Sequence, residues 1–177
     1  MQNQQLPTDL DLISQAIKGD TDAYGTLVDR YKQALYRHCF SIVRNEDAAE
    51  DIAQESFIAA YYNLHKYSST YRFGTWLFKI GTNKCLNYLR SQAKQVQNND
   101  ELIAAIASAG KSPHDNSLDA ELHQAVRSLQ PRYQAVISLH YWQGLSYADT
   151  ALVMGAPINS VRVWLKRAKD QLRKELA

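Results

Sequence analysis

Apolar residues recur every three to four positions along most of the chain, and few glycines or prolines interrupt them. This spacing places the apolar side chains on one face of an α-helix. In the first half of the chain it predicts four helices, over approximately residues 8–18, 20–44, 49–64 and 75–89. The first of these begins with Thr8, which has capping-box spacing to Asp11 and so marks a helix start.

The helical periodicity fades between residues 92 and 117, where Gln, Asn, Asp and Ser dominate. Such a composition is typical of a flexible linker and therefore of a domain boundary. We place the linker at residues 96–116, between an N-terminal domain of residues 1–95 and a C-terminal domain of residues 117–177. The predicted fold class is all-α: a helical bundle and a helix-turn-helix, joined by a flexible linker.

The C-terminal domain carries the helix-turn-helix pattern. One helix is expected over residues 118–129 and another from Pro131, which suits the first helical turn. A short helix capped by Ser146 then ends near Gly155, and a basic helix begins near Asn159. A recognition helix needs an apolar face for its own domain and a basic face for the major groove, and this helix has both. Any helical hairpin with a basic end would give the same spacing.

Charge is sorted along the chain although the total is almost balanced, with 20 basic and 18 acidic residues. Residues 46–55 hold five acids and no base, and residues 56–99 hold six bases and no acid. Residues 160–174 hold six bases and one acid. Two basic segments in separate domains favour a polyanionic partner, because neutralising phosphates releases counterions. Two solvated helix faces are the plainer alternative.

The first basic segment is also rich in aromatic residues, with eight between positions 57 and 78. Aromatic rings interleaved with cations suit single-stranded nucleic acid, whose bases stack on rings while its backbone attracts positive charge. Phe57 and Tyr61 have core spacing and are expected to pack inside. The better candidates for base contact flank a short loop and are Tyr67, Tyr71, Phe73 and Trp76.

No pattern points to catalysis, a metal or a cofactor. Two cysteines exclude a disulfide-stapled scaffold and a four-cysteine zinc site, and both are expected in the core. The five histidines show no paired ligand spacing, and no glycine-rich phosphate loop or nucleophile elbow occurs. The first residues do not resemble a signal peptide, and the longest apolar run, 102–107, is too short to enter a membrane as a span. We therefore expect a cytoplasmic protein without membrane insertion.

Taken together, four motifs resemble the extracytoplasmic-function (ECF) sigma factors of bacterial RNA polymerase. DTDAY at 20–24 with LVDRY at 27–31 is similar to the opening of the family's first conserved region. AAEDIAQESF at 48–57 is similar to the segment that binds polymerase. FGTWLFKIGTN at 73–83 is similar to the reader of the −10 promoter element, and LQPRYQAV at 129–136 opens the family's −35 reader. The resemblance covers nearly the whole chain outside the linker.

The resemblance implies a role for each segment. Core RNA polymerase would be bound at its β′ clamp helices and its β flap, with the clamp contact made by Asp47, Glu50, Asp51, Gln54 and Glu55. The loop at 66–72 would hold a flipped base while Asn83 reads a base edge. The full −10 set would be Lys66, Tyr67, Tyr71, Arg72, Phe73, Trp76, Lys79, Asn83, Lys84 and Arg90. The −35 duplex would be bound by Ser160, Arg162, Val163, Lys166, Arg167 and Lys169. Promoter DNA and an anti-sigma factor are the other implied partners.

Val163 and Trp164 depart from the family pattern, which has a small polar residue and an arginine at these positions. The Trp164 ring can stack on sugar-phosphate or dock on a partner, so the −35 specificity of relatives does not transfer to this chain.

Two other functions remain open at this point. A stand-alone helix-turn-helix regulator would account for residues 117–177 but not for the acidic and aromatic segments at 46–78. A helical interaction protein without a nucleic-acid role conflicts with the acid-free stretch at 56–99. An enzyme is the least expected class.

Overall fold

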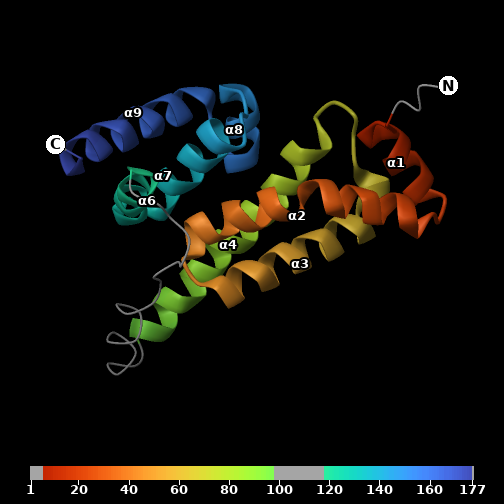
Figure 1. Ribbon diagram of the computed structural model, residues 1–177, viewed down its shortest axis with the longest axis horizontal. Helices are drawn as coiled ribbons and strands as arrows, with labels where there is room; N and C mark the ends of the chain where they lie inside the picture. The colour runs from red at the N-terminus through yellow and green to blue at the C-terminus, as the bar shows by residue number, and fades with distance from the viewer. Residues whose placement is uncertain (1–5, 98–117, 177) are drawn as a thin grey trace.

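The computed structural model describes residues 6–97 and 118–176, and its described residues form helices and no strand (Figure 1). The first group comprises α1 (Asp9–Ile17), α2 (Thr21–Val43), α3 (Glu46–Tyr62), the short 3-10 helix η1 (Leu64–Lys66) and α4 (Phe73–Gln97). The second comprises α6 (Leu118–Ser128), α7 (Pro131–Ile137), the π-helical turn η3 (Ser138–Trp142), α8 (Tyr147–Met154) and α9 (Ile158–Glu175). The all-α fold class with two helical units is confirmed.

Most helix starts lie where their caps predict. Thr8 and Asp11 form a complete capping box at α1. Asp20 caps α2 by accepting from the backbone N–H groups of Asp22 and Ala23. Between α2 and α3, Arg44 adopts the left-handed conformation (φ 58°), and its N–H donates to the carbonyl of Phe40. These local bonds satisfy the backbone groups that a helix end leaves unpaired.

Helix α4 is longer than its apolar pattern indicates. It begins at Phe73 rather than near residue 75, and it continues to Gln97, past the point where the periodicity fades. Residues 91–97 contain Gln, Ala and Lys without glycine or proline, so they sustain a helix without an apolar face. Residues 98–117, which include most of the predicted linker, lie outside the described residues. The predicted domain boundaries therefore stay predictions.

The N-terminal bundle packs α2 between α1, α3 and α4. Its fully buried side chains include Leu27, Leu35 and Leu77, together with Cys39 and Cys85, so both cysteines are core residues as expected. Tyr24 of α2 donates its hydroxyl to the carbonyl of Phe57, 2.6 Å away. In this bundle α3 and α4 pack against each other and against α2, with one outward face each.

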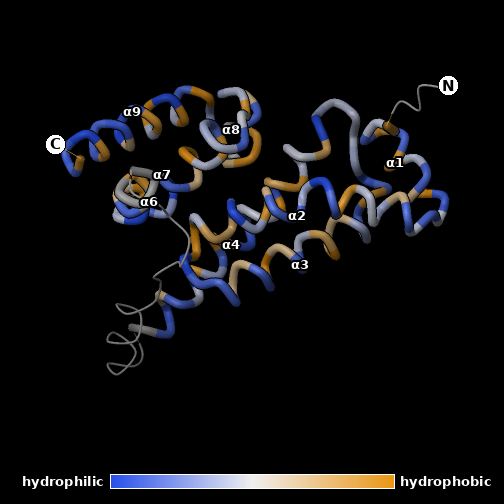
Figure 2. The backbone as a smooth tube through the Cα atoms, in the orientation of Figure 1, coloured by the Kyte–Doolittle hydropathy of each residue, from blue (hydrophilic) through white to orange (hydrophobic). Residues whose placement is uncertain are grey.

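The C-terminal unit is a helix-turn-helix supported by α7. Val136 of α7 and Val161, Leu165 and Ala168 of α9 are buried in one apolar cluster. Gly155 ends α8 with a φ of 59°, a left-handed conformation that glycine adopts without strain. Figure 2 shows α9 alternating between hydrophobic and hydrophilic positions, as expected for a helix with one docked face.

The two helical units pack against each other. Helix α8 lies on α4, and α7 lies on α2. Ala135, Leu139 and Val153 of the C-terminal unit are fully buried in the same apolar cluster as the core of the N-terminal bundle. Figure 1 shows the C-terminal helices as a second body beside that bundle. The sequence pattern gives no indication of this packing.

Candidate nucleic-acid interface

Helix α3 turns its acids outward and its small apolar residues inward. Ala49, Ile52 and Ala53 are buried against the bundle, since they recur at helical spacing. The exposed side chains on the other face are Asp47, Glu50, Asp51, Gln54 and Glu55. We call these five residues the acidic face. Tyr36 of α2 lies near this face: burial raises the pKa of its hydroxyl, and the carboxylates of Glu46, Glu50 and Asp47 raise it further.

Glu55 is the member of the acidic face that forms an ion pair among the described residues, whereas the Gln54 amide donates to the Glu50 carboxylate at 3.3 Å. The Glu55 carboxylate lies 2.7 Å from the ammonium of Lys84 on α4, and both side chains are partly open to solvent. Such an exposed pair contributes little to stability, about 0–1 kcal/mol. The pair marks where the acidic face of α3 meets the lysine side chains of α4.

Tyr67, Phe73 and Trp76 form one aromatic cluster at the start of α4. Tyr67 lies 6.0 Å from Phe73 and 5.5 Å from Trp76, measured between ring centroids. Phe73 is only 1% exposed and packs edge-on against Tyr31 of α2. The expectation that Phe73 contacts a base is therefore corrected. As the first residue of α4, Phe73 points into the bundle and supports the two other rings, and it has no open face for a base.

The loop that precedes α4 is open to solvent and internally braced. The Tyr67 hydroxyl donates to the carbonyl of Tyr71, and the hydroxyls of Ser68 and Thr70 are 2.8 Å apart. Residues 68–72 are all exposed. The loop thus presents polar and aromatic groups in a defined shape.

A pocket of about 460 Å³ lies between this loop and the first turn of α1. Its walls include Tyr67, Tyr71 and Arg72 from the predicted set, and also Asp9 of α1. Asp9 accepts from Arg30 at 2.8 Å and from the Tyr31 hydroxyl. Sequence analysis missed the part played by α1, because Asp9 meets its partners only after the chain folds back over more than twenty residues.

A second pocket of about 430 Å³ lies between α3 and α4. It brings together four predicted residues, Lys66 of η1 and three from α4: Trp76, Asn83 and Lys84. Lys66 is held by Asn63 at 2.9 Å, and Asn83 is exposed. Of the two remaining cations of the −10 set, Lys79 is half-buried, and Arg90 is exposed and donates to Asn87 at 3.0 Å.

The outward face of α9 is basic, as predicted. Arg162, Val163, Lys166, Arg167 and Lys169 are exposed, whereas Ser160 is half-buried. Arg162 donates to Asn159 at 3.2 Å and lies 5.9 Å from the ring of Tyr147 at the start of α8. These contacts brace a cation at the N-terminal end of the helix, the part of a recognition helix that reaches base edges.

Two comparisons with known proteins match this arrangement. Residues 27–95 match the family described as Sigma-70 region 2, and residues 119–172 match Sigma-70, region 4. The chain is 32% identical over 176 residues to the ECF RNA polymerase sigma factor SigW of Bacillus subtilis (strain 168), with 93% of this chain and 94% of that protein covered. The chain belongs to the ECF RNA polymerase sigma factors.

This sigma factor also has the fold of solved relatives. It superposes on CnrH, solved in complex with the cytosolic domain of CnrY, with a TM-score of 0.68 and 28% identity, over 95% of this chain and 96% of that one. It superposes on the sigma factor RpoE of Bartonella quintana, solved with the anti-sigma factor NepR, with a TM-score of 0.76 over 86% of this chain and 96% of that one. At 24% identity the second likeness shows the fold alone.

The family match explains both halves of the sequence pattern. A sigma factor binds RNA polymerase and directs it to promoter DNA, so one chain carries an acidic segment and two basic ones. The match to region 2 accounts for the segments at 46–78, which a stand-alone helix-turn-helix regulator leaves unexplained. In the part of the chain that the structure describes, no group of three or more His, Cys, Asp or Glu side chains could hold a metal ion, and no helix has the length and apolarity of a membrane span.

Trp164 of the sigma factor docks inside region 4. It is half-buried against the apolar cluster of α9, and the guanidinium of Arg132 on α7 lies 4.9 Å from its ring centroid. The sequence did not predict this contact with the region's own α7. Trp164 thus braces α9 against α7.

Gly74 is expected to be required for the shape of the first pocket. A Cβ atom at this position would lie 2.8 Å from Cε1 of Tyr31, closer than carbon atoms pack. Gly74→Ala therefore displaces the Tyr31 ring, which contacts both Asp9 and Phe73. We expect opening of promoter DNA by the holoenzyme to fall about threefold or more, read by fluorescence of a 2-aminopurine base in the −10 strand.

Gly25→Ala is the matched control, because a Cβ atom there meets no atom within 4 Å. Equal opening by both variants would show that the position of Tyr31 does not matter.

Proposed function

We propose that the acidic face of α3 is the surface on which this sigma factor docks to core polymerase. The observation that carries the proposal is the exposure of all five side chains on one helix face, while the cations of residues 56–99 stand on other elements. A face of one sign meets a basic surface, such as that implied for the β′ clamp helices, with a defined orientation and a fast encounter. Region 4 would make a separate contact with the β flap.

The two pockets beside the aromatic cluster are the proposed sites for unstacked bases of the −10 strand. Each pocket combines an aromatic wall with a cation: Tyr71 with Arg72 in the first, Trp76 with Lys66 in the second. Removing a base from the duplex costs a few kcal/mol, and stacking on a ring returns about 1–3 kcal/mol per base. Lys79, Lys84 and Arg90 would attract the phosphates of the same strand.

The outward face of α9 is the proposed reader of the −35 duplex. Arg162, Lys166 and Arg167 are exposed within its first three turns, so that one insertion of the helix brings them to the groove together. Neither DNA contact needs high affinity alone, since polymerase holds both regions and makes the second contact intramolecular.

The proposed activity consists of binding and orienting DNA, without a chemical step, a metal or a cofactor of the protein's own. Its place of work would be the cytoplasm, where polymerase meets the chromosome. An anti-sigma factor is the proposed regulatory partner, because the membership of this chain in the ECF sigma factors implies one.

Transcription with purified components tests the proposal. Core polymerase supplemented with this protein should initiate at a discrete set of sites on a pool of genomic fragments, whereas core alone should not. The protein without polymerase should bind the same fragments weakly. Tight, specific binding without polymerase would instead indicate the stand-alone regulator.

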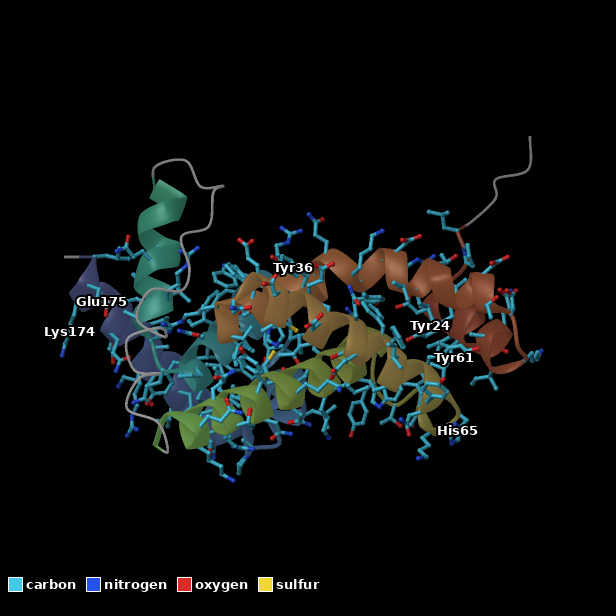
Figure 3. All side chains as sticks on the ribbon, turned by 90° about the horizontal axis from the view of Figure 1, so that it is seen from below. Tyr24, Tyr36, Tyr61, His65, Lys174 and Glu175 are labelled. Atoms are coloured by element: carbon cyan, nitrogen blue, oxygen red, sulfur yellow. The ribbon has the colours of Figure 1, made fainter. Side chains whose placement is uncertain are left out.

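Removing one cation of α9 should weaken −35 recognition. Arg167→Ala is expected to reduce holoenzyme binding to a −35 duplex about 3- to 10-fold and to lower the slope of log affinity against log salt by about one. Lys174→Ala is the matched control, because Lys174 is exposed at the far end of the same helix (Figure 3). Equal losses in the two variants would remove Arg167 from the reading face.

A further inference from the structure

The side chain at the centre of the outward face of α9 is apolar. Successive residues of an α-helix are rotated by about 100°, so Val163 stands about 160° around the helix from the buried Val161 and Leu165. Asn159 lies one turn before it and Arg167 one turn after it, and both are exposed on the same side. Val163 therefore points most directly away from the apolar cluster that holds α9 in region 4.

Contacts on both sides of Val163 fix the rotation of α9 about its axis. On one side, the guanidinium of Arg162 lies 5.9 Å from the ring centroid of Tyr147 on α8. On the other side, the half-buried ring of Trp164 lies 4.9 Å from the guanidinium of Arg132 on α7. Because both sequence neighbours are held in this way, α9 cannot turn to bury the valine without breaking these contacts.

Val163 contributes little to the fold. Its side chain is 46% exposed, and a β-branched residue has a lower helix propensity than the lysines and arginines beside it. Single exposed apolar residues are common on protein surfaces, so exposure alone assigns no role. What distinguishes this valine is its position, because the exposed cations Arg162, Lys166 and Arg167 surround it on the face proposed to enter DNA.

The major groove offers one apolar group to such a side chain, the C5-methyl group of thymine. The other groups that distinguish the bases there are hydrogen-bond donors and acceptors, and the valine side chain has neither. Valine over the edge of guanine, adenine or cytosine would cover polar groups and return no hydrogen bond. Contact with the methyl group instead removes apolar surface from water, which favours thymine about fourfold.

We propose that Val163 selects a thymine in the −35 element by contact with its methyl group. The inference rests on the proposed function, because it assumes that α9 enters the major groove of the −35 duplex. Val163 is then a specificity-determining residue, whereas the cations around it supply affinity through phosphates. A change at position 163 should alter the preference between sequences, and removal of a cation should weaken binding to all sequences alike.

Replacement of thymine by uracil removes the methyl group alone and so tests this contact. Holoenzyme is titrated with a −35 duplex from a promoter at which it initiates, and with copies in which each thymine of either strand is replaced in turn by uracil. For the wild type we expect at least one thymine whose replacement lowers affinity about fourfold. The same replacement should have no effect on the Val163→Ser variant, whereas Val163→Ile, which keeps an apolar side chain, should retain the wild-type ratio.

Ile158→Ser is the matched control. Ile158 is also an exposed apolar residue of α9, at 37%, but it lies about 140° around the helix from Val163. This variant should keep the thymine-to-uracil ratio of the wild type. Equal wild-type affinity for all the uracil duplexes, or an unchanged ratio in Val163→Ser, would overturn the assignment of Val163 and leave the −35 role of α9 intact. Failure of Arg167→Ala to weaken −35 binding would count against the proposed function instead.

Discussion

Reversing two charges of the acidic face is expected to abolish binding of core polymerase. Asp47 and Asp51 lie four residues apart on α3, both exposed and on the same side of the helix. The Asp47→Lys/Asp51→Lys variant replaces attraction by repulsion at the centre of the contact. Breaking close charge pairs across an interface costs about 2–5 kcal/mol, so that affinity should fall about 100-fold or more. A binding titration with labelled core polymerase measures the loss.

The fold should survive this double substitution, because the buried side chains of α3 are untouched. Asp47 stands in the first turn of α3, so its replacement by lysine loses a favourable interaction with the helix dipole, at a cost of about 1 kcal/mol or less. Asp29→Lys is the matched control: it also reverses an exposed acid, but on α2 away from the acidic face. Normal binding by the double variant, with helicity retained, would remove α3 from the polymerase contact.

Removing two aromatic side chains beside the pockets is expected to block strand opening. Tyr71 is 42% exposed on the loop, and Trp76 lines the second pocket. If each ring stacks on one base, the Tyr71→Ala/Trp76→Ala variant forfeits about 2–6 kcal/mol, or at least about 30-fold in open complex. Reactivity of −10 thymines toward permanganate measures the melted strand, and affinity for core polymerase should remain at the wild-type level.

The conservative pair Tyr71→Phe/Trp76→Phe separates stacking from other causes. It keeps a ring at each position and should retain most of the opening activity. Failure of the phenylalanine variant to the same extent as the alanine variant would show that hydrogen bonding or fold stability, and not stacking, determines the effect.

Sequence alone predicts the features that depend on near neighbours. Thr8, Asp20 and Ser146 cap their helices through bonds to residues two or three positions away, and the alternation of core and surface on α3 and α9 follows the helical period. Contacts between residues far apart in the sequence are missed, because a local pattern depends on near neighbours only. Phe73 belongs to an aromatic run, but its burial depends on Tyr31 of another helix.

The contributions of Asp9 and His38 could not be predicted either. Asp9 becomes part of the first pocket through Arg30 and Tyr31, and His38 joins a residue 100 positions away. No periodicity reports such contacts, because each partner has an ordinary local pattern. The packing of region 4 on region 2 is missed in the same way.

Site-specific crosslinking tests most directly whether the acidic face of α3, the loop before α4 and the outward face of α9 bind the partners proposed for them. A photoreactive amino acid is placed at position 51, 71 or 167, and each protein is assembled with core polymerase on promoter DNA. We predict that position 51 links to the β′ subunit, position 71 to the non-template strand of the −10 element, and position 167 to the −35 duplex. Crosslinks from position 51 to DNA, or from positions 71 and 167 only to polymerase, would contradict the proposed assignment of these surfaces.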